Sequence, residues 1–431
     1  MIVSDANASL LQAIGYYIFL YPIIMSVFWV IGGLYFWWRR ELHGEEEKGN
    51  PPEPDLWPAL TILVPCYNEA AVIDATCQSL YTLDYPDYHV IFIDDASSDE
   101  TSEIIGSWLP KAPFFHLLRL EKNQGKALAL NSALYRAVNE PITVVIDADT
   151  LIAPKSLKWL VKPFVYQPRL GAVTGNPMAF NRTNLLEKVQ VAEFASIIGL
   201  IKRAQRVLGR VLTVSGCIAA YRTNVLKEVG GFSPRTATED IDITWVLQRH
   251  FYEVWYAPQA VAFIQVPSTL RQYWKQRCRW ARGGWHLLRT HKGIFSRWRW
   301  RRLWPVYIDF VLSHLWSFFF VLGTLLWIVS YLLFHYPIGF TPIPAWYGAI
   351  VSVACLTQFG AALVANHRYD SRLWQTFFWV PWYPIFFFVF GSLAILRTAP
   401  EGLFGNLERT GRWNSPTREK MTLNTTLNDP S

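Results

Sequence analysis

The chain has 431 residues, of which 52% are hydrophobic, 16% are aromatic and only 17% are charged, with a net charge of +7. The charged fraction is well below the roughly 25% of soluble globular domains, and this composition excludes a disordered chain, a collagen-like chain and a small disulfide scaffold. The apolar residues are unevenly distributed along the chain, so the protein class follows from where they lie.

Four segments are apolar and long enough to cross a bilayer, which takes about 20 residues of helix. They are 13–38, 303–335, 345–366 and 374–396. Pro381 and Pro384 can break the last of them into two half-helices, because proline cannot continue an α-helix. The sequence therefore predicts an integral membrane protein with one large water-facing domain between the first two segments.

The distribution of Lys and Arg predicts how the chain lies in the membrane. Residues 1–38 contain neither, whereas Arg39 and Arg40 follow directly, so we expect the N-terminus outside and the large domain inside. The tail 397–431 is basic and favours an inside C-terminus, which four simple spans would not give. A re-entrant or hairpin course of 374–396, broken at its prolines, would reconcile the two, and we favour a cytoplasmic tail.

Short apolar runs alternate with helical patterns in the water-facing domain. The expected strands are 60–64, 90–93, 115–118 and 143–146, and the expected helices are 70–80, 101–108 and 126–138. This alternation predicts a parallel sheet with right-handed crossovers. Ligands of such sheets bind beyond the carboxyl ends of the strands, so the residues that follow each strand are candidates for a site.

Polar or acidic residues follow each of the four strands. They are Asn68-Glu69, Asp94 to Asp99, Asn123-Gln124-Gly125-Lys126 and Asp147-Ala148-Asp149. One acidic strand end is often only a turn and a helix cap, but four at one sheet edge favour a binding site. Mg²⁺, or Mn²⁺ in its place, binds through one or two carboxylates together with phosphate oxygens. Alternate side chains of an extended segment splay, so one carboxylate of the pair Asp147 and Asp149 can reach such a metal and the other a sugar or ribose of a nucleotide-diphosphate donor; both are candidate metal ligands.

Thr238-Glu239-Asp240 precede an apolar-periodic helix at 241–250. Acids in a first helical turn favour the helix electrostatically, so a purely structural role is one interpretation. The other makes Asp240 a general base, since a sugar hydroxyl must lose its proton as it attacks an anomeric carbon. One carboxylate can do both, and we predict Asp240, with its neighbour Glu239, as catalytic.

The stretch 266–302 carries eleven Lys or Arg and no acid. Within it Gln276, Arg279 and Trp280 share one helix face, where Arg279 can bind phosphate and Trp280 can stack on a sugar ring. An amphipathic helix lying on anionic lipid is the plainer interpretation, and the stretch is long enough for both. The adjoining membrane segment argues against nucleic acid as a partner.

Taken in order between membrane segments, Asp95, Asp149, Asp240 and Gln276-x-x-Arg279-Trp280 resemble the processive family-2 glycosyltransferases, which include cellulose and hyaluronan synthases. Over residues 20–418 the chain is most similar to the bacterial poly-β-1,6-N-acetyl-D-glucosamine synthases. The segments that carry this second resemblance are 25–37, 175–177, 197–203, 213–216, 238–242, 274–277 and 412–416.

The resemblance implies an α/β fold, a GT-A-type domain with a mixed sheet that binds a nucleotide sugar and is inserted between transmembrane helices. The chain would then divide into an anchor (1–40), a linker (41–57), the GT-A domain (58–267), interface helices (268–302), about three further spans (303–396) and a basic tail (397–431).

The resemblance also implies a role for each matching residue. Glu69 and Asp95 would hold the uridine, with Lys126 close to the donor. Asp147 and Asp149 would bind the donor and the metal. The residues that would frame the diphosphate and the acceptor are Gly216, Gln276, Arg279 and Trp280. One departure is Ala96, which follows Asp95 where relatives often have glycine.

The implied function is inverting, processive polymerisation of N-acetylglucosamine from UDP-GlcNAc, coupled to export of the growing polysaccharide across a bacterial inner membrane. Membrane lipid would be a partner, and in the resembled family a small membrane subunit and cyclic di-GMP can control activity. The alternatives are another membrane family-2 transferase, such as a cellulose- or hyaluronan-like synthase or one with a lipid acceptor, and a non-catalytic export scaffold. The sugar and the linkage rest on the resemblance alone.

Overall fold

The computed structural model describes residues 5–43, 53–335 and 346–407. Most of the predicted linker 41–57 lies outside the described residues, as does the greater part of the basic tail 397–431 with its motif 412–416. The side of the membrane on which the C-terminus lies therefore stays a prediction.

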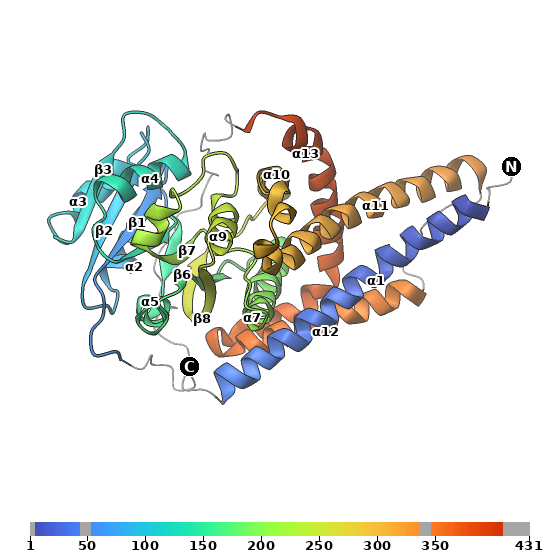
Figure 1. Cartoon of the computed structure of the whole chain (residues 1–431), viewed down its shortest axis with the longest axis horizontal. Helices are drawn as coiled ribbons and strands as arrows, with labels where there is room; N and C mark the ends of the chain where they lie inside the picture. The colour runs from blue at the N-terminus through green and yellow to red at the C-terminus, as the bar shows by residue number, and fades with distance from the viewer. Residues whose placement is uncertain (1–4, 44–52, 336–345, 408–431) are drawn as a thin grey trace.

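A mixed eight-stranded sheet, with the strand order β3-β2-β1-β4-β7-β6-β8-β5, is the centre of the water-facing domain (Figure 1). The first four strands in the chain pair in parallel, whereas β7 is antiparallel to β4 and β6, and β5 is antiparallel to β8. The strands are β1 (Leu60–Cys66), β2 (Tyr88–Asp94), β3 (Phe115–Arg119), β4 (Ile142–Ile146), β5 (Thr150–Ile152), β6 (Leu170–Ala179), β7 (Ile218–Arg222) and β8 (Glu253–Ile264). The four expected strands are confirmed, and the antiparallel pairs agree with the mixed sheet that the resemblance implies.

Helices cover both faces of this sheet. On one face lie α2 (Ile73–Tyr81), α3 (Thr101–Trp108) and α5 (Ser156–Tyr166), and on the other lie α4 (Lys126–Arg136), α8 (Thr223–Glu228) and α9 (Glu239–Arg249). Successive strand side chains point to opposite faces, so Ile62 joins the core under α2 while Leu63 joins the core under α4. Because both faces are packed, the carboxyl ends of the strands form a fixed edge.

Three long apolar helices extend away from the sheet domain, toward the right of Figure 1. They are α1 (Asp5–Phe36), α11 (Trp304–Phe334) and α12 (Trp346–Asn366), and α1 contacts both others. Large apolar side chains on them are exposed, such as Ile31 at 66% and Leu332 at 68%, which only a lipid environment would cover. With the segment Ile385–Phe404, the described residues hold four helices long and apolar enough to span a membrane. The chain is a membrane protein.

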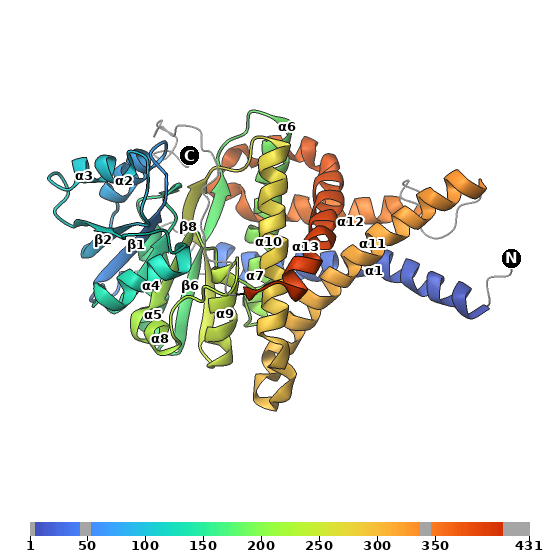
Figure 2. The same cartoon turned by 90° about the horizontal axis from the view of Figure 1, so that it is seen from above.

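The fourth predicted span is not one regular helix. It consists of the 3-10 helix η7 (Ser371–Trp382), the π-helix η8 (Ile385–Gly391) and α13 (Ser392–Phe404). The transition from the 3-10 helix η7 to the π-helix η8 falls at Pro381 and Pro384, which confirms the predicted break. In both Figure 1 and Figure 2, α13 runs across the direction of the three long helices, and it packs on α10 (Leu270–Thr290). This arrangement favours a course along the membrane surface.

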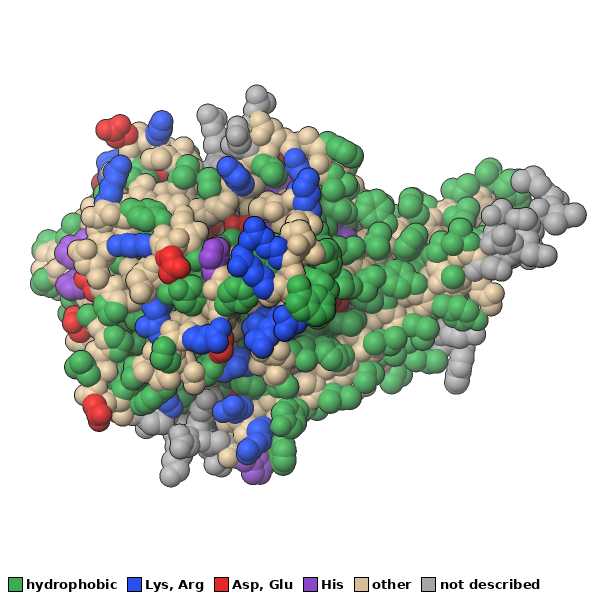
Figure 3. Space-filling model, viewed as in Figure 1, with side chains coloured by type: hydrophobic (Ala, Val, Ile, Leu, Met, Phe, Trp, Pro, Cys, Tyr) green, Lys and Arg blue, Asp and Glu red, His purple; other side chains and the backbone are tan. Residues whose placement is uncertain are grey.

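Basic and aromatic residues mark the boundary between the two parts of the molecule. Figure 3 shows apolar side chains over the long helices and Lys and Arg gathered where these helices meet the sheet domain. Trp298 is 69% exposed, and the exposed Arg299, Arg301 and Arg302 immediately precede α11. Aromatic and basic side chains in this order are typical of the headgroup region of a bilayer.

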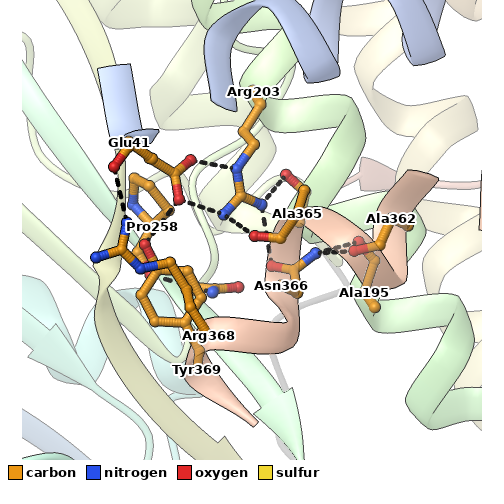
Figure 4. A network of polar contacts seen from close by, with 11 residues as sticks. Glu41, Ala195, Arg203, Pro258, Ala362, Ala365, Asn366, Arg368 and Tyr369 are labelled. Atoms are coloured by element: carbon orange, nitrogen blue, oxygen red, sulfur yellow. Dashed lines mark hydrogen bonds and ion pairs between the residues drawn. The ribbon is translucent and has the colours of Figure 1, made fainter. Parts of the chain in front are cut away.

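A buried ion pair joins the C-terminal end of the first span to the sheet domain (Figure 4). Arg203 of α7 (Ile201–Val207) donates to both carboxylate oxygens of Glu41, at 2.6 and 3.0 Å, and neither side chain is exposed. Arg203 also donates to the side-chain oxygen of Asn366 at the end of α12 (2.9 Å), and the Tyr369 hydroxyl donates to Glu41 (2.8 Å). We call Glu41, Arg203, Asn366 and Tyr369 the junction network.

Candidate active site

The site begins at Asp95, directly after β2. Its buried carboxylate accepts hydrogen bonds from the backbone amides of Gln124 (2.8 Å) and Gly125 (2.7 Å), at the start of α4. Burial raises the pKa of Asp95, and these two amide hydrogens oppose the rise. Asp95 thereby fixes the start of α4, and with it the position of the next residue, Lys126.

The backbone around Asp95 takes a conformation that glycine favours. Ala96 has a φ of +61°, in the left-handed region, so the position where relatives often have glycine keeps a glycine-like backbone here. Asn68, in the loop after β1, has a φ of +55°, which asparagine tolerates better than most residues. Its side-chain oxygen accepts from the amide of Ser98 at 2.8 Å, which ties the two loops together. The buried Glu69 lies in the same loop.

Lys126 lies at the centre of an acidic cluster. Its Nζ is 2.6 Å from Oδ1 of Asp147, after β4, and 3.0 Å from Oε1 of Glu239, at the start of α9. It also donates to the carbonyl of Gly216 at 3.3 Å. Burial alone would lower the pKa of Lys126, but the two carboxylates raise it well above its usual value, so the ammonium stays charged. The ammonium of Lys126 thus contacts three segments that the sequence analysis treated separately, at Asp147, Gly216 and Glu239.

Asp240 adjoins this cluster with a carboxylate suited to proton transfer. Its Oδ1 accepts from the amide of Ile241 (2.9 Å) in the first turn of α9, and a Cβ added at Gly216 would lie 3.1 Å from its Oδ2. Burial and the neighbouring charge of Glu239 raise the pKa of Asp240 to about 6, against the effect of Lys126. A carboxylate with a pKa near neutrality can accept a proton and release it again. The local helix contact and the proton-accepting role are therefore compatible.

Asp147 and Asp149 have the chemistry of a site for a hard divalent cation. Burial raises the pKa of Asp147, Lys126 lowers it, and the nearby charge of Asp149 raises it again. A cation would relieve the repulsion between these two carboxylates. Among the described residues no group of three His, Cys, Asp or Glu side chains could hold a metal unaided. The pair fits Mg²⁺ or Mn²⁺ that takes its remaining ligands from water and phosphate oxygens.

The helix α10 brings the predicted phosphate-binding residue to the same cluster. A Cβ added at Gly283 would lie 2.4 Å from the hydroxyl of Thr238, so only glycine allows α10 to pack this closely against the start of α9. Arg279 is exposed on α10. Burial raises the pKa of Glu239, but Lys126 and, less strongly, Arg279 bring it below its usual value. The Arg279 guanidinium therefore lies within electrostatic range of the acids.

The other residues of the motif on α10 are more buried. Arg277 pairs with both oxygens of Glu193, at 2.7 and 2.8 Å, and its guanidinium lies 4.6 Å from the ring centre of the half-buried Trp280. This pair anchors α10 to the sheet domain and leaves Arg279 as the exposed arginine of the motif. The side-chain oxygen of Gln276 is buried and has no hydrogen-bond partner among the described residues.

Several residues that hold the cluster in place were missed by the sequence reasoning. Thr244 accepts from the amide of Val214 at 2.9 Å and donates to the carbonyl of Asp240 at 2.6 Å. Lys202 donates to the Ser215 hydroxyl at 2.6 Å. A lysine inside an apolar helical pattern was the available signal for Lys202, whereas nothing in the sequence distinguishes Thr244 from other helical threonines.

Comparison with known proteins places this geometry in context. A protein-family model described as "Glycosyltransferase like family 2" matches residues 58–283. Poly-β-1,6-N-acetyl-D-glucosamine synthase of Staphylococcus epidermidis is 32% identical over 411 residues, which cover 93% of this chain and 98% of the relative. The synthase of Staphylococcus aureus strain COL is 32% identical over 407 residues, with the same coverage.

A solved structure shares the fold. The mannosyltransferase of Pyrobaculum calidifontis, solved with GDP-mannose and Mn²⁺, matches with a TM-score of 0.55 and 22% identity, over 90% of this chain and 99% of that one. The match therefore extends beyond the sheet domain to the apolar helices.

Proposed function

This chain belongs to glycosyltransferase family 2, and on that premise we propose that it polymerises N-acetylglucosamine from UDP-GlcNAc into poly-β-1,6-N-acetylglucosamine. The observation that carries the proposal is the meeting of Lys126, Asp147, Glu239 and Asp240 at one sheet edge. The likeness to the two staphylococcal synthases over nearly their whole length supports the sugar and the linkage. The catalytic domain would face the cytoplasm of a bacterial inner membrane, as Arg39 and Arg40 favour.

The donor would bind along the carboxyl ends of β1, β2 and β4. Asp95 and Glu69 would contact the uridine, and Asp147 with Asp149 would hold a divalent cation, Mg²⁺ or Mn²⁺. When bound, that cation would neutralise the charge that develops on the leaving diphosphate. Arg279 would approach the diphosphate from α10 with a planar pair of donors. The positive charge of Lys126 would reduce the repulsion among the carboxylates around it.

Asp240 would act on the acceptor. It takes the proton from a hydroxyl of the terminal sugar while that oxygen attacks the anomeric carbon from the face opposite UDP. The bond between the anomeric carbon and the diphosphate oxygen breaks, and UDP leaves with the bonding electrons. An α-linked donor thus gives a β-linked product, and no covalent enzyme intermediate is needed.

The apolar helices would serve export of the product. A polysaccharide carries too many hydroxyl groups to enter hydrocarbon unaided, so a polymer made on one side of the bilayer needs a path through protein. Attachment of the catalytic domain to α1 and α12 at the junction network places synthesis beside the spans. The growing chain would pass directly from the site into the membrane region.

Incubation of membranes with single UDP-sugars and Mg²⁺ or Mn²⁺ tests the proposed function. We expect a long polymer from UDP-GlcNAc alone, cleaved by a glycosidase specific for β-1,6-linked N-acetylglucosamine. A single sugar on a lipid would favour a lipid-acceptor transferase, and a polymer resistant to that enzyme would favour another synthase. Failure to transfer from any UDP-sugar would favour a non-catalytic export scaffold.

Transfer should fall as the pH drops through about 6, the pKa to which burial and Glu239 raise Asp240. Below that value Asp240 is protonated and cannot accept the hydroxyl proton, so kcat/KM should decrease about tenfold per pH unit. Above it kcat/KM should reach a plateau. Initial rates at low UDP-GlcNAc concentration across this range measure the profile, and a rate that stays constant well below pH 6 would contradict the assignment of Asp240.

A further inference from the structure

Lys202 of α7 is a buried ammonium group with an unusual set of partners. It is 3% exposed, and its Nζ donates to the hydroxyl of Ser215 at 2.6 Å and to that of Thr174, on β6, at 3.4 Å. No carboxylate forms an ion pair with it among the described residues. Burial lowers its pKa to about 8, and the more distant charge of Asp240 only partly opposes this. Burying a charged group without an opposite charge in contact is costly, so a purely packing role does not explain a lysine here.

One partner of Lys202, Ser215, belongs to a loop next to the candidate site. The amide of Ser215 donates to the Thr174 hydroxyl at 2.7 Å, so Lys202 and Thr174 hold this residue from two sides. The next residue, Gly216, lies against the Asp240 carboxylate, and its carbonyl accepts a hydrogen bond from Lys126. We call residues 213–217 the acceptor loop, because its Gly216 lies against Asp240, the proposed base for the acceptor hydroxyl. The carbonyl of Cys217 in the same loop accepts from the amide of Asp147 at 3.4 Å.

The helix that carries Lys202 is itself fixed. The adjacent Arg203 points into the junction network, where Figure 4 shows it between Glu41 and Asn366. Successive residues of a helix point in different directions, so α7 contacts the membrane helices through Arg203 and the acceptor loop through Lys202. The position of the acceptor loop therefore depends on a helix that the spans hold in place.

We propose that Lys202 is a positioning residue for the acceptor, which holds Ser215 and Gly216 against Asp240 so that the sugar hydroxyl meets the base. This inference rests on the proposed function. Loss of the ammonium would release Ser215 and Gly216 next to Asp240, while Asp95 would stay held by the amides of Gln124 and Gly125. Water would still reach Asp240, so hydrolysis of the donor should continue as transfer to sugar fails.

Lys202→Met, which keeps the unbranched apolar stem of the side chain without its ammonium group, tests the proposal in the full-length detergent-solubilised enzyme. With UDP-GlcNAc as donor and a short β-1,6-linked N-acetylglucosamine oligosaccharide as acceptor, we expect kcat/KM for the acceptor to fall about 10- to 100-fold, as for loss of a hydrogen bond to a charged group. UDP-GlcNAc hydrolysis and donor affinity should stay within about twofold of wild type, and Lys202→Arg should restore part of the transfer.

Lys227→Met is the matched control. Lys227 lies on α8 and donates to the carbonyl of Val138, beyond the end of α4 farthest from Lys126, so transfer and hydrolysis should both match wild type. Unchanged acceptor kinetics in Lys202→Met would overturn the proposal. Equal losses of donor binding, hydrolysis and transfer would also overturn it, since they would make Lys202 a general structural residue.

Ser215→Ala removes the hydroxyl that Lys202 holds, so this variant alone should also lower transfer to the acceptor, however well Lys202→Met folds. The losses of transfer in the two single variants should not add in the double variant. Additive losses would contradict a shared role. A wild-type enzyme that makes no polymer from UDP-GlcNAc would instead overturn the proposed function, which keeps the two failures distinguishable.

Discussion

Replacement of Asp240 by asparagine is expected to abolish polymer synthesis while UDP-GlcNAc still binds. Asparagine keeps the shape of the side chain and an oxygen that can accept from the amide of Ile241, but it cannot take up the proton of the attacking hydroxyl. Loss of a general base lowers rates by about 10²–10⁴-fold. Radiolabelled UDP-GlcNAc incorporation measures the rate, and equilibrium binding of UDP-GlcNAc measures the donor site.

Asp84→Asn serves as the control for this experiment, because Asp84 is a half-exposed acid that pairs with Lys158 at the surface. It should leave both measurements unchanged. Polymer at near-normal rates from Asp240→Asn would show that another group takes the proton, with Glu239 as the nearest carboxylate to test. If donor binding were lost together with transfer, Asp240 would have to contact the donor and not only the acceptor.

Glu41→Gln is expected to lower the free energy of unfolding by about 3–5 kcal/mol, the usual cost of removing one partner from a buried ion pair. The guanidinium of Arg203 would remain fully buried without its counter-charge, and the hydroxyl of Tyr369 would lose a charged acceptor. The lower stability should appear as a lower apparent thermal midpoint of the purified protein, compared with the wild type in one detergent and at one scan rate.

Glu53→Gln is the matched control, since Glu53 is 74% exposed and lies 3.7 Å from Lys158. Exposed pairs of this kind contribute little, so its thermal midpoint should equal that of the wild type. If Glu41→Gln were as stable as the wild type, the junction network would have to be hydrated in solution, and its role in joining the spans to the sheet domain would be wrong.

The parallel half of the fold could be predicted because its signals are local. Each strand from β1 to β4 is an apolar run followed at once by polar residues, and parallel strands place those residues at one edge. Asp95, Lys126 and Asp147 were found in this way. The other half has no such signal, because β6, β7 and β8 pair with partners from distant parts of the sequence, and only the mixed character of the sheet came from the resemblance.

The contacts that complete the site could not be predicted either, because they join residues that lie far apart in the sequence. The resemblance implies that Lys126 lies close to the donor, but only the folded chain shows that it bridges Asp147 and Glu239. Lys202 and Arg203 in sequence are two cations in a helix, which usually lie on a solvated face. Both are buried, and their partners Ser215 and Glu41 come from segments before and after them in the chain.

The buried pair between Glu41 and Arg203 has a consequence for elongation. Tilting of the sheet domain relative to α1 and α12 would separate two buried charges with no water to replace their contact, so we expect the sheet domain to keep its orientation to these helices. In the proposed polymerisation the saccharide would then advance by one sugar past a stationary base after each addition.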